Sequence, residues 1–314
     1  MPTTYILGHK KPDTDAVVAP MALEFLFKQQ DCFGYTNPMA AITEELNPET
    51  RFLLEKFGVT PPRIISAADL AEGDTVVLVD HNEADQRMDG LDESLIVEIV
   101  DHHKAKLNLS QPVFMTFKAW GASSTIVYWM MKQCAVVPDK LIASLMLAAI
   151  LSDTVGFKSA TTTQTDKDFG MELATIAEVT DIDAFTLEIF KAKSNISSLT
   201  IEQIVKNDYK VFDFGTKTMI DQLETVEQDI LVVERKAELL AAMQTVKSEM
   251  QVPLLFVAIT DILKVNTKLL IMGEDEAVVA TRAFGGTVTD NILDIGPKMS
   301  RKKEIAPAIE KALA

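Results

Sequence analysis

The sequence predicts an α/β protein, with a mostly parallel sheet flanked by helices in its first part and a smaller mixed α/β domain after it. Short runs rich in Val, Ile and Leu alternate with longer amphipathic or apolar segments through the first half. This rhythm is typical of parallel strands connected by helices. The chain has 314 residues, of which 47% are hydrophobic, and this length favours two domains, each with its own core.

The elements of the first domain follow from these runs in order. We expect strands at 3–7, 75–80 and 95–101, and helical segments at 16–30, 121–134, 138–151, 163–179 and 181–193. An all-parallel arrangement of this kind usually carries helices on both faces of its sheet, and we expect the same here.

A polar connector at 194–199 separates the two domains, which we therefore place at 1–193 and 194–314. After a short segment at 201–208, the second domain should contain strands at 209–214, 217–224, 254–263 and 268–273, and one long charged helix at 230–250. It holds no aspartate–histidine cluster.

Composition excludes several classes of protein. The formal net charge of −16 disfavours nucleic acid as a partner, because proteins that bind it need a basic surface. The most apolar segment, 141–153, is shorter than the ~20 residues that span a bilayer, so we expect a buried helix and no membrane partner. The N-terminus lacks a secretory pattern, which predicts a cytoplasmic protein. Cys32 and Cys134 form no C-x-x-C motif and are expected to be small buried hydrophobic residues.

All four histidines lie in or beside aspartate-containing motifs: His9 in GHKKPDTD, His81 in DHNE, and His102 and His103 in DHH. Imidazole and carboxylate groups are the ligands that Mn²⁺, Co²⁺, Fe²⁺ and Zn²⁺ accept. These motifs follow the expected strands, and the loops beyond the carboxyl ends of parallel strands converge in space. Aspartates that are distant in sequence can therefore share one ion.

Each motif also has a structural interpretation. Asp13 could cap the following helix, Asp80 could satisfy free amides of a nearby helix, and Asp153 could end an apolar helix. We expect only a positioning role for His81. Three consecutive ionisable groups in DHH are costly to bury unless they are paired or bind an ion. Pro12 stiffens the loop before Asp13 and Asp15. If this segment is extended, the two aspartates point in different directions and could bind different ions.

The motifs GHKKPDTD, DHNE, DHH and SDT (152–154), followed by SRKKE (300–304), resemble the DHH phosphoesterase superfamily and, within it, the manganese-dependent family II inorganic pyrophosphatases. DHH indicates only the superfamily, whereas DHNE and SRKK are specific to the pyrophosphatases. The resemblance covers nearly the whole chain. It departs from the family pattern at Lys11, where members often have Asn, and at Ala16, where they have Ser or Thr. Neither residue is an expected ligand, but Lys11 leaves substrate affinity and metal preference open.

The resemblance implies a site of two Mn²⁺ ions, with Co²⁺ as a possible substitute. It implies one ion held by His9, Asp13, Asp80 and Asp153, and a second held by Asp15, Asp80, His102 and Asp153. It further implies pyrophosphate bound by His103, Lys210, Arg301 and Lys302. Lys210 is preferred to Lys206 because it stands in the family's D-x-K-x-F context. The catalytic set would then be Asp15, Asp80, His103, Lys210, Arg301 and Lys302.

The implied reaction is hydrolysis of inorganic pyrophosphate in a site between the two domains, in a homodimer formed through the first domain. Two metals about 4 Å apart would share a hydroxide that attacks phosphorus directly, and additional Mg²⁺ or Mn²⁺ would arrive with the substrate. An exopolyphosphatase or short-oligonucleotide phosphodiesterase is the alternative enzyme, although Gly285 and Gly286 lack the histidine of the GGGH-type motif of those nucleases. A non-catalytic metal or phosphate sensor is the third hypothesis. The segment SRKKE also has a structural interpretation, in which it is a solvated helix start and does not bind phosphate.

Overall fold

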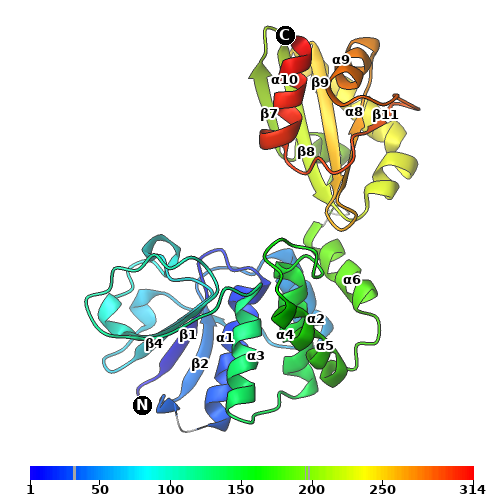
Figure 1. Ribbon diagram of the computed structural model, residues 1–314. Helices are drawn as coiled ribbons and strands as arrows, with labels where there is room; N and C mark the ends of the chain where they lie inside the picture. The colour runs from blue at the N-terminus through cyan, green and yellow to red at the C-terminus, as the bar shows by residue number, and fades with distance from the viewer. Residues whose placement is uncertain (31–32, 195, 197–198) are drawn as a thin grey trace. The chain divides into compact units, whose positions relative to one another are not determined.

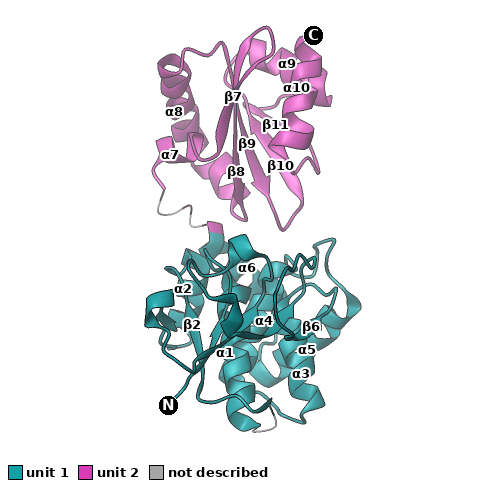
Figure 2. Ribbon diagram, turned by 90° about the vertical axis from the view of Figure 1, so that its left-hand side faces the viewer, with its two compact units in different colours: residues 1–193 teal, residues 194–314 magenta. Residues whose placement is uncertain are grey.

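The computed structural model describes residues 1–30, 33–194, 196 and 199–314. It divides into two compact units, Met1–Lys193 and Ser194–Ala314, which Figure 2 shows in different colours. Cys32 and part of the expected connector at 194–199 lie outside the described residues. Cys134 packs against the core of the first unit, as expected of a small hydrophobic residue, but it is only partly buried.

The first unit contains a six-stranded, entirely parallel sheet in the order β3-β2-β1-β4-β5-β6. Its strands are β1 Thr4–Leu7, β2 Pro38–Ile42, β3 Arg63–Ile64, β4 Thr75–Val79, β5 Ile96–Asp101 and β6 Phe114–Phe117. The predicted α/β class is confirmed. The sequence did not predict β2, β3 and β6, because these strands are short and β3 and β6 are largely exposed, so none carries a long buried apolar run.

The α-helices of the first unit contribute to one core cluster, on one face of the sheet (Figure 1). They are α1 Thr14–Gln29, α2 Pro48–Lys56, α3 Ser123–Gln133, α4 Lys140–Asp153, α5 Gln164–Ala177 and α6 Ile182–Ser194. The opposite face packs against loops and short 3₁₀ turns such as Ala67–Asp69 and Glu93–Leu95. The expectation of helices on both faces is therefore wrong, because the segments before β4, β5 and β6 hold no α-helix.

The strand order places three motif-bearing loops side by side. β1 pairs with β2 on one edge and with β4 on the other, and β4 pairs with β5. From β1 the chain adds β2 and β3 on one side and then β4, β5 and β6 on the other. Such a reversal of strand order opens a crevice at the carboxyl ends of the strands. The motifs that contain His9, Asp80 and His102 follow β1, β4 and β5 and meet at this edge.

The second unit contains a five-stranded mixed sheet in the order β11-β10-β9-β8-β7, in which only β8 and β9 are parallel. Its strands are β7 Tyr209–Asp213, β8 Lys217–Thr225, β9 Leu254–Asp261, β10 Asn266–Leu270 and β11 Ile292–Asp294. Its helices are α7 Ile201–Val205, α8 Lys236–Glu249, α9 Glu274–Phe284 and α10 Ala306–Leu313.

Helices cover both faces of this second sheet, with α7 and α8 on one core cluster and α9 and α10 on the other. The single helix expected at 230–250 is divided into a π-helical turn, Ile230–Glu234, and α8. Among the described residues of the whole chain, no helix has the length and apolar character needed to cross a bilayer.

Candidate metal centre

The loop after β1 leads directly into α1 and carries the first candidate ligands. Asp13 is the N-cap of α1, because the amide of Ala16 donates to its Oδ1 at 3.0 Å. The capping interpretation is therefore correct, yet the same Oδ1 lies 3.6 Å from Nε2 of His9. Asp15 lies in the first turn of α1, so the expected extended segment through Asp15 is wrong. The helical turn separates the two carboxylates instead.

Asp15 is completely buried and faces the N-terminus of α3. The amides of Ser123 and Ser124 donate to its two oxygens at 2.5 and 2.9 Å. The helix N-cap, Ala122, has no side chain that could bind these amides, so Asp15 satisfies them from another helix. Burial, and then the charge of Asp80, raise the pKa of Asp15 to about 7.

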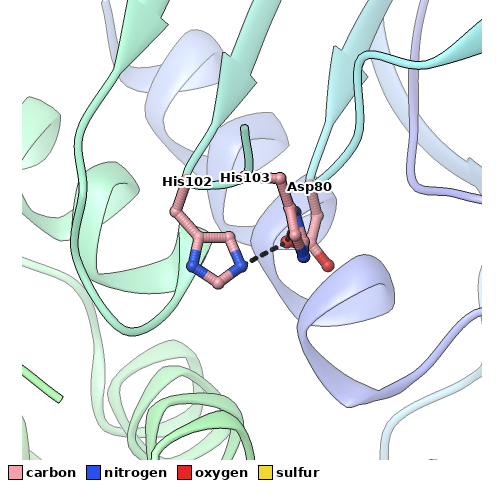
Figure 3. A group of neighbouring side chains, drawn as sticks. All are labelled: Asp80, His102 and His103. Carbon is pink, nitrogen blue, oxygen red and sulfur yellow. Dashed lines mark ion pairs between the residues drawn. The ribbon is translucent and has the colours of Figure 1, made fainter. Parts of the chain in front are cut away.

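Asp80 follows β4 in the left-handed backbone region, with φ of 65°, and its side chain is 1% exposed. Its Oδ2 lies 3.6 Å from Nε2 of His9, and its Oδ1 lies 3.2 Å from Nε2 of His102. The hydroxyl of Ser123 also donates to Oδ1, at 2.9 Å. A non-glycine residue in this region is strained by about 1–3 kcal/mol, and such residues cluster at functional sites. Asp80 is thus held between two histidines from different loops, and Figure 3 shows its contact with His102.

His102 is oriented by the loop before α3. Its Nδ1 lies 2.9 Å from the carbonyl of Trp120, to which it can donate, and this leaves Nε2 facing Asp80 and, at 3.9 Å, Oδ2 of Asp153. Burial lowers the pKa of His102, but the hydrogen bond and charge of Asp80 outweigh it and raise the pKa to about 9. One ring nitrogen fixed by a carbonyl and the other free is the usual arrangement of a metal-binding histidine.

Asp153 is the last residue of α4. A negative charge at a helix C-terminus opposes the helix dipole, so helix termination gives no reason for an aspartate here. Burial raises the pKa of Asp153 well above its usual value, and the charges of Asp15, Asp13 and Asp80 add to the effect. The buried carboxylates repel one another, and a cation between them would remove this repulsion.

His103 is half-exposed and lines a cavity of about 230 Å³ together with His9, Asp80, His81, Glu83 and Gln86. Its Nδ1 lies 3.0 Å from Oδ1 of Asp101. This hydrogen bond, opposed by partial burial, raises the pKa of His103. His103 is therefore positioned as a cationic donor at the cavity wall.

Sequence reasoning missed Asp101 and Asn82, which hold this loop. Asn82 is fully buried, donates to Oδ2 of Asp101 at 2.6 Å and accepts from the amide of Lys106 at 2.6 Å. The only signal was their place inside DHH and DHNE. His81, by contrast, donates from Nδ1 to the carbonyl of Val79 at 2.9 Å, and burial lowers its pKa to about 4. It belongs to no ligand group among the described residues, which fits the expected positioning role.

Potential ligand atoms come together in three overlapping groups, and within each group they lie within 4.8 Å of one another. The groups are Asp15, Asp80, His102 and Asp153; His9, Asp13 and Asp80; and Asp80, His102 and His103. All six expected ligands fall in the first two groups, and Asp80 belongs to every group. Nε2 of His102 is buried without a hydrogen-bond partner, and four crowded carboxylates need positive charge. This donor set fits divalent cations such as Mn²⁺.

Apart from His103, the expected phosphate-binding residues lie in the second unit. Lys210, in β7, is exposed, and its Nζ lies 5.3 Å from the centre of the Phe212 ring. Lys206 instead pairs with Glu202 and Glu249, each at 3.0 Å. Its charge is already compensated, which favours Lys210 as the residue that is free to bind an anion.

SRKKE forms a π-helical turn, Arg301–Ile305, that leads into α10, with Ser300 as its cap. A helix does start here, and Lys302 is exposed, which is compatible both with a phosphate-binding role and with a solvated surface. Arg301 is different, because its Nη2 lies 3.0 Å from Oδ1 of Asp208 and its Nη1 is buried without a hydrogen-bond partner. Sequence reasoning missed Asp221 nearby, a fully buried residue whose pKa burial raises to about 8.

Comparisons with known proteins agree with this geometry. Residues 3–150 match the DHH family, N-terminal domain, and residues 187–312 match the DHHA2 domain. The chain is 37% identical to the manganese-dependent inorganic pyrophosphatase of Methanocaldococcus jannaschii over 321 residues, which covers 98% of both chains. It is also 37% identical to that of Methanothrix thermoacetophila over 311 residues, which covers 98% of this chain and 97% of the relative.

Solved structures give the same result. A crystal structure from Methanococcus jannaschii, assigned to the family II inorganic pyrophosphatases, is 34% identical, with a TM-score of 0.61 and 99% of each chain covered. An exopolyphosphatase-related protein from Bacteroides fragilis is 16% identical, with a TM-score of 0.50, 99% of this chain and 91% of that chain covered, and shows the shared fold alone. With full-length relatives of this identity, the chain belongs to the family of manganese-dependent inorganic pyrophosphatases.

Proposed function

We propose that this chain hydrolyses inorganic pyrophosphate to two orthophosphates in a centre that holds two Mn²⁺ ions. The observation that carries the proposal is the position of Asp80, which belongs at once to the His9–Asp13 group and to the Asp15–His102–Asp153 group. A carboxylate shared in this way is what a two-metal site requires. The names of the full-length relatives supply the substrate.

The ligand sets we propose are His9, Asp13, Asp80 and Asp153 for one ion and Asp15, Asp80, His102 and Asp153 for the other. Co²⁺ would suit the same nitrogen and oxygen donors. When bound, two such ions would neutralise charge on the substrate and make a water molecule acidic enough to attack phosphorus at neutral pH. The protein's own part is to hold Asp15 and Asp80 rigidly, through Ser123 and Ser124, so that the carboxylates do not move when charge develops.

Cationic donors would bind the phosphate oxygens. The hydrogen bond of His103 to Asp101 raises the pKa of His103 and so favours its protonated form. Arg301 is fixed by Asp208 and retains a buried, unpaired Nη1, while Lys210 and Lys302 offer exposed ammonium groups. Arg supplies a planar pair of donors and Lys a point charge. We propose that additional Mg²⁺ or Mn²⁺ enters with pyrophosphate, because its oxygens bind such hard cations well.

A product assay with the purified chain in Mn²⁺ tests this function. We expect orthophosphate from pyrophosphate, and neither mononucleotide from a dinucleotide nor stepwise shortening of a long polyphosphate at a comparable rate. Faster attack on either of those substrates would favour the alternative phosphoesterase hypotheses. Tight binding of a non-hydrolysable pyrophosphate analogue, without any turnover of pyrophosphate, would support a sensor and contradict the proposal.

We also propose that two copies of the chain associate through the first unit. β6 is the outer strand of its sheet, and its Phe114 and Met115 are 75% and 50% exposed. An open edge with large apolar side chains readily pairs with another chain. Light scattering on a size-exclusion column should give twice the mass of one chain, and the double substitution Phe114→Lys, Met115→Lys should give the monomer. A monomeric unmodified protein would contradict this part of the proposal.

A further inference from the structure

Lys193, near the end of α6, contacts two of the elements that surround the candidate metal centre. Its Nζ lies 3.3 Å from the hydroxyl of Ser152, the residue before Asp153. The same Nζ lies 3.4 Å from Oε2 of Glu49 in α2. The ring of Phe190, with its centre 5.3 Å from Nζ, supports the side chain from its own helix. The position of this cation is therefore fixed, although 47% of the side chain is exposed.

Glu49 lies in the first turn of α2, and its side chain is only 2% exposed. Its Oε1 accepts a hydrogen bond from the hydroxyl of Thr14 at 2.6 Å, and Thr14 stands between Asp13 and Asp15 in the chain. Its Oε2 has no hydrogen-bond partner and faces Lys193. The pair thus contacts Thr14, which neighbours candidate ligands on α1, and Ser152, which neighbours a candidate ligand on α4.

The charge of Lys193 reaches these ligands. The ammonium group of Lys193 lies beside Ser152, the residue that precedes Asp153, and its partner Glu49 binds Thr14, the residue between Asp13 and Asp15. A positive charge in this position must repel a cation placed between these carboxylates, and a negative charge must attract one.

We propose that Glu49 and Lys193 form a charge pair outside the ligand set that tunes the affinity of the centre for divalent cations. Lys193 weakens cation binding and Glu49 strengthens it. The inference rests on the proposed function, since it requires metal ions in this centre. Substituting the two residues should therefore change cation affinity in opposite directions. If the pair were merely structural, losing either partner would disturb the same contacts and change the affinity in the same direction.

Calorimetric titration of the metal-free, full-length chain with Mn²⁺ tests the proposal. Lys193→Met keeps the aliphatic stem and should tighten binding about three- to tenfold; Glu49→Gln keeps an oxygen for Thr14 and should weaken it by a similar factor. The double variant should return close to the unmodified affinity. Because Lys193 is half-exposed, the shift for Lys193→Met should shrink when the salt concentration is raised.

The pair Lys56–Glu188 provides a matched control. It also joins α2 to α6, with Nζ 2.6 Å from Oε1, but neither residue contacts a neighbour of a candidate ligand among the described contacts. Lys56→Met and Glu188→Gln should leave Mn²⁺ affinity unchanged. Weaker binding in both Lys193→Met and Glu49→Gln, or no shift in either, would overturn the charge-pair proposal. An unmodified chain that binds no Mn²⁺ would instead overturn the proposed metal centre itself.

Discussion

The amide and the hydroxyl of Ser124 both donate to Oδ1 of Asp15, at 2.9 and 2.5 Å. Two donors from one residue fix the position of this buried carboxylate and favour its ionised form, although burial still raises its pKa to about 7. The first turn of α3 therefore acts as a rigid support for a candidate ligand that lies on α1. No local sequence pattern predicts this support, because the contact forms only when α1 and α3 pack against each other.

Ser124→Ala should weaken Mn²⁺ binding about tenfold, because a hydrogen bond to a charged group contributes roughly 1.5–3 kcal/mol and the two backbone amides would remain. The loss should be greatest at lower pH, where protons compete for Asp15. Calorimetric titration across pH 6–8 measures it. Ser144→Ala is the control, since that hydroxyl donates to Lys140 O within its own helix and not to a candidate ligand among the described contacts. Equal affinities for the Ser124→Ala and unmodified proteins would remove the proposed role of Ser124.

Asp80→Asn should release both Mn²⁺ ions and lower kcat by at least about a thousandfold, because the shared carboxylate would lose its charge. Asn tolerates the left-handed backbone that Asp80 adopts, so the fold should be retained and the effect assigned to the charge. Elemental analysis of the purified variant, together with its circular dichroism spectrum, checks both points. A folded variant that still carries two Mn²⁺ per chain would contradict the assignment of Asp80 as the common ligand.

The metal-free protein should become less stable as the pH rises from 6 to 9. The pKa of Asp15 is raised to about 7, and those of His9 and His102 to about 9 despite the opposing effect of burial on the histidines. A group with a higher pKa in the folded state binds extra protons there, so its contribution to stability is present at low pH and lost as the pH rises through the folded-state pKa. His81 acts in the opposite sense: burial lowers its pKa from 6.5 to about 4, so it destabilises the fold as the pH falls below about 6.5 and opposes the trend only at the acidic end of this range.

Thermal unfolding in a chelator at several pH values measures this dependence, and excess Mn²⁺ should raise Tm most at the alkaline end, where the ligands bind fewest protons. A weaker slope should remain with Mn²⁺ present, because burial raises the pKa of Asp221 in the second unit to about 8. Constant or increasing stability of the metal-free chain over this range would show that the carboxylate–histidine cluster does not dominate its stability.

The grouping of His9, Asp80 and His102 could be predicted from the sequence because it depends on one geometric rule. Strands β1, β4 and β5 are adjacent and parallel, so residues just beyond their carboxyl ends must converge. The positions of Asp15 and Glu49 depend instead on how α1, α2 and α3 pack, which no local pattern reports. Sequence periodicity likewise cannot show which face of the sheet a helix covers, and this is why the expectation of helices on both faces was wrong.

Lys302→Ala should raise KM for pyrophosphate about tenfold and leave the Mn²⁺ content unchanged, because Lys302 belongs to the proposed cationic set of the second unit and a charged ammonium group is not a metal ligand. Lys303→Ala is a closely matched control: the residue is adjacent, also exposed and in the same π-helical turn. Steady-state phosphate release and metal analysis of both variants distinguish a phosphate-binding lysine from a solvated helix start. If the two substitutions have the same small effect on KM, these lysines are solvated surface residues and do not bind phosphate. Loss of metal in Lys302→Ala would show that the role assigned to Lys302 is wrong.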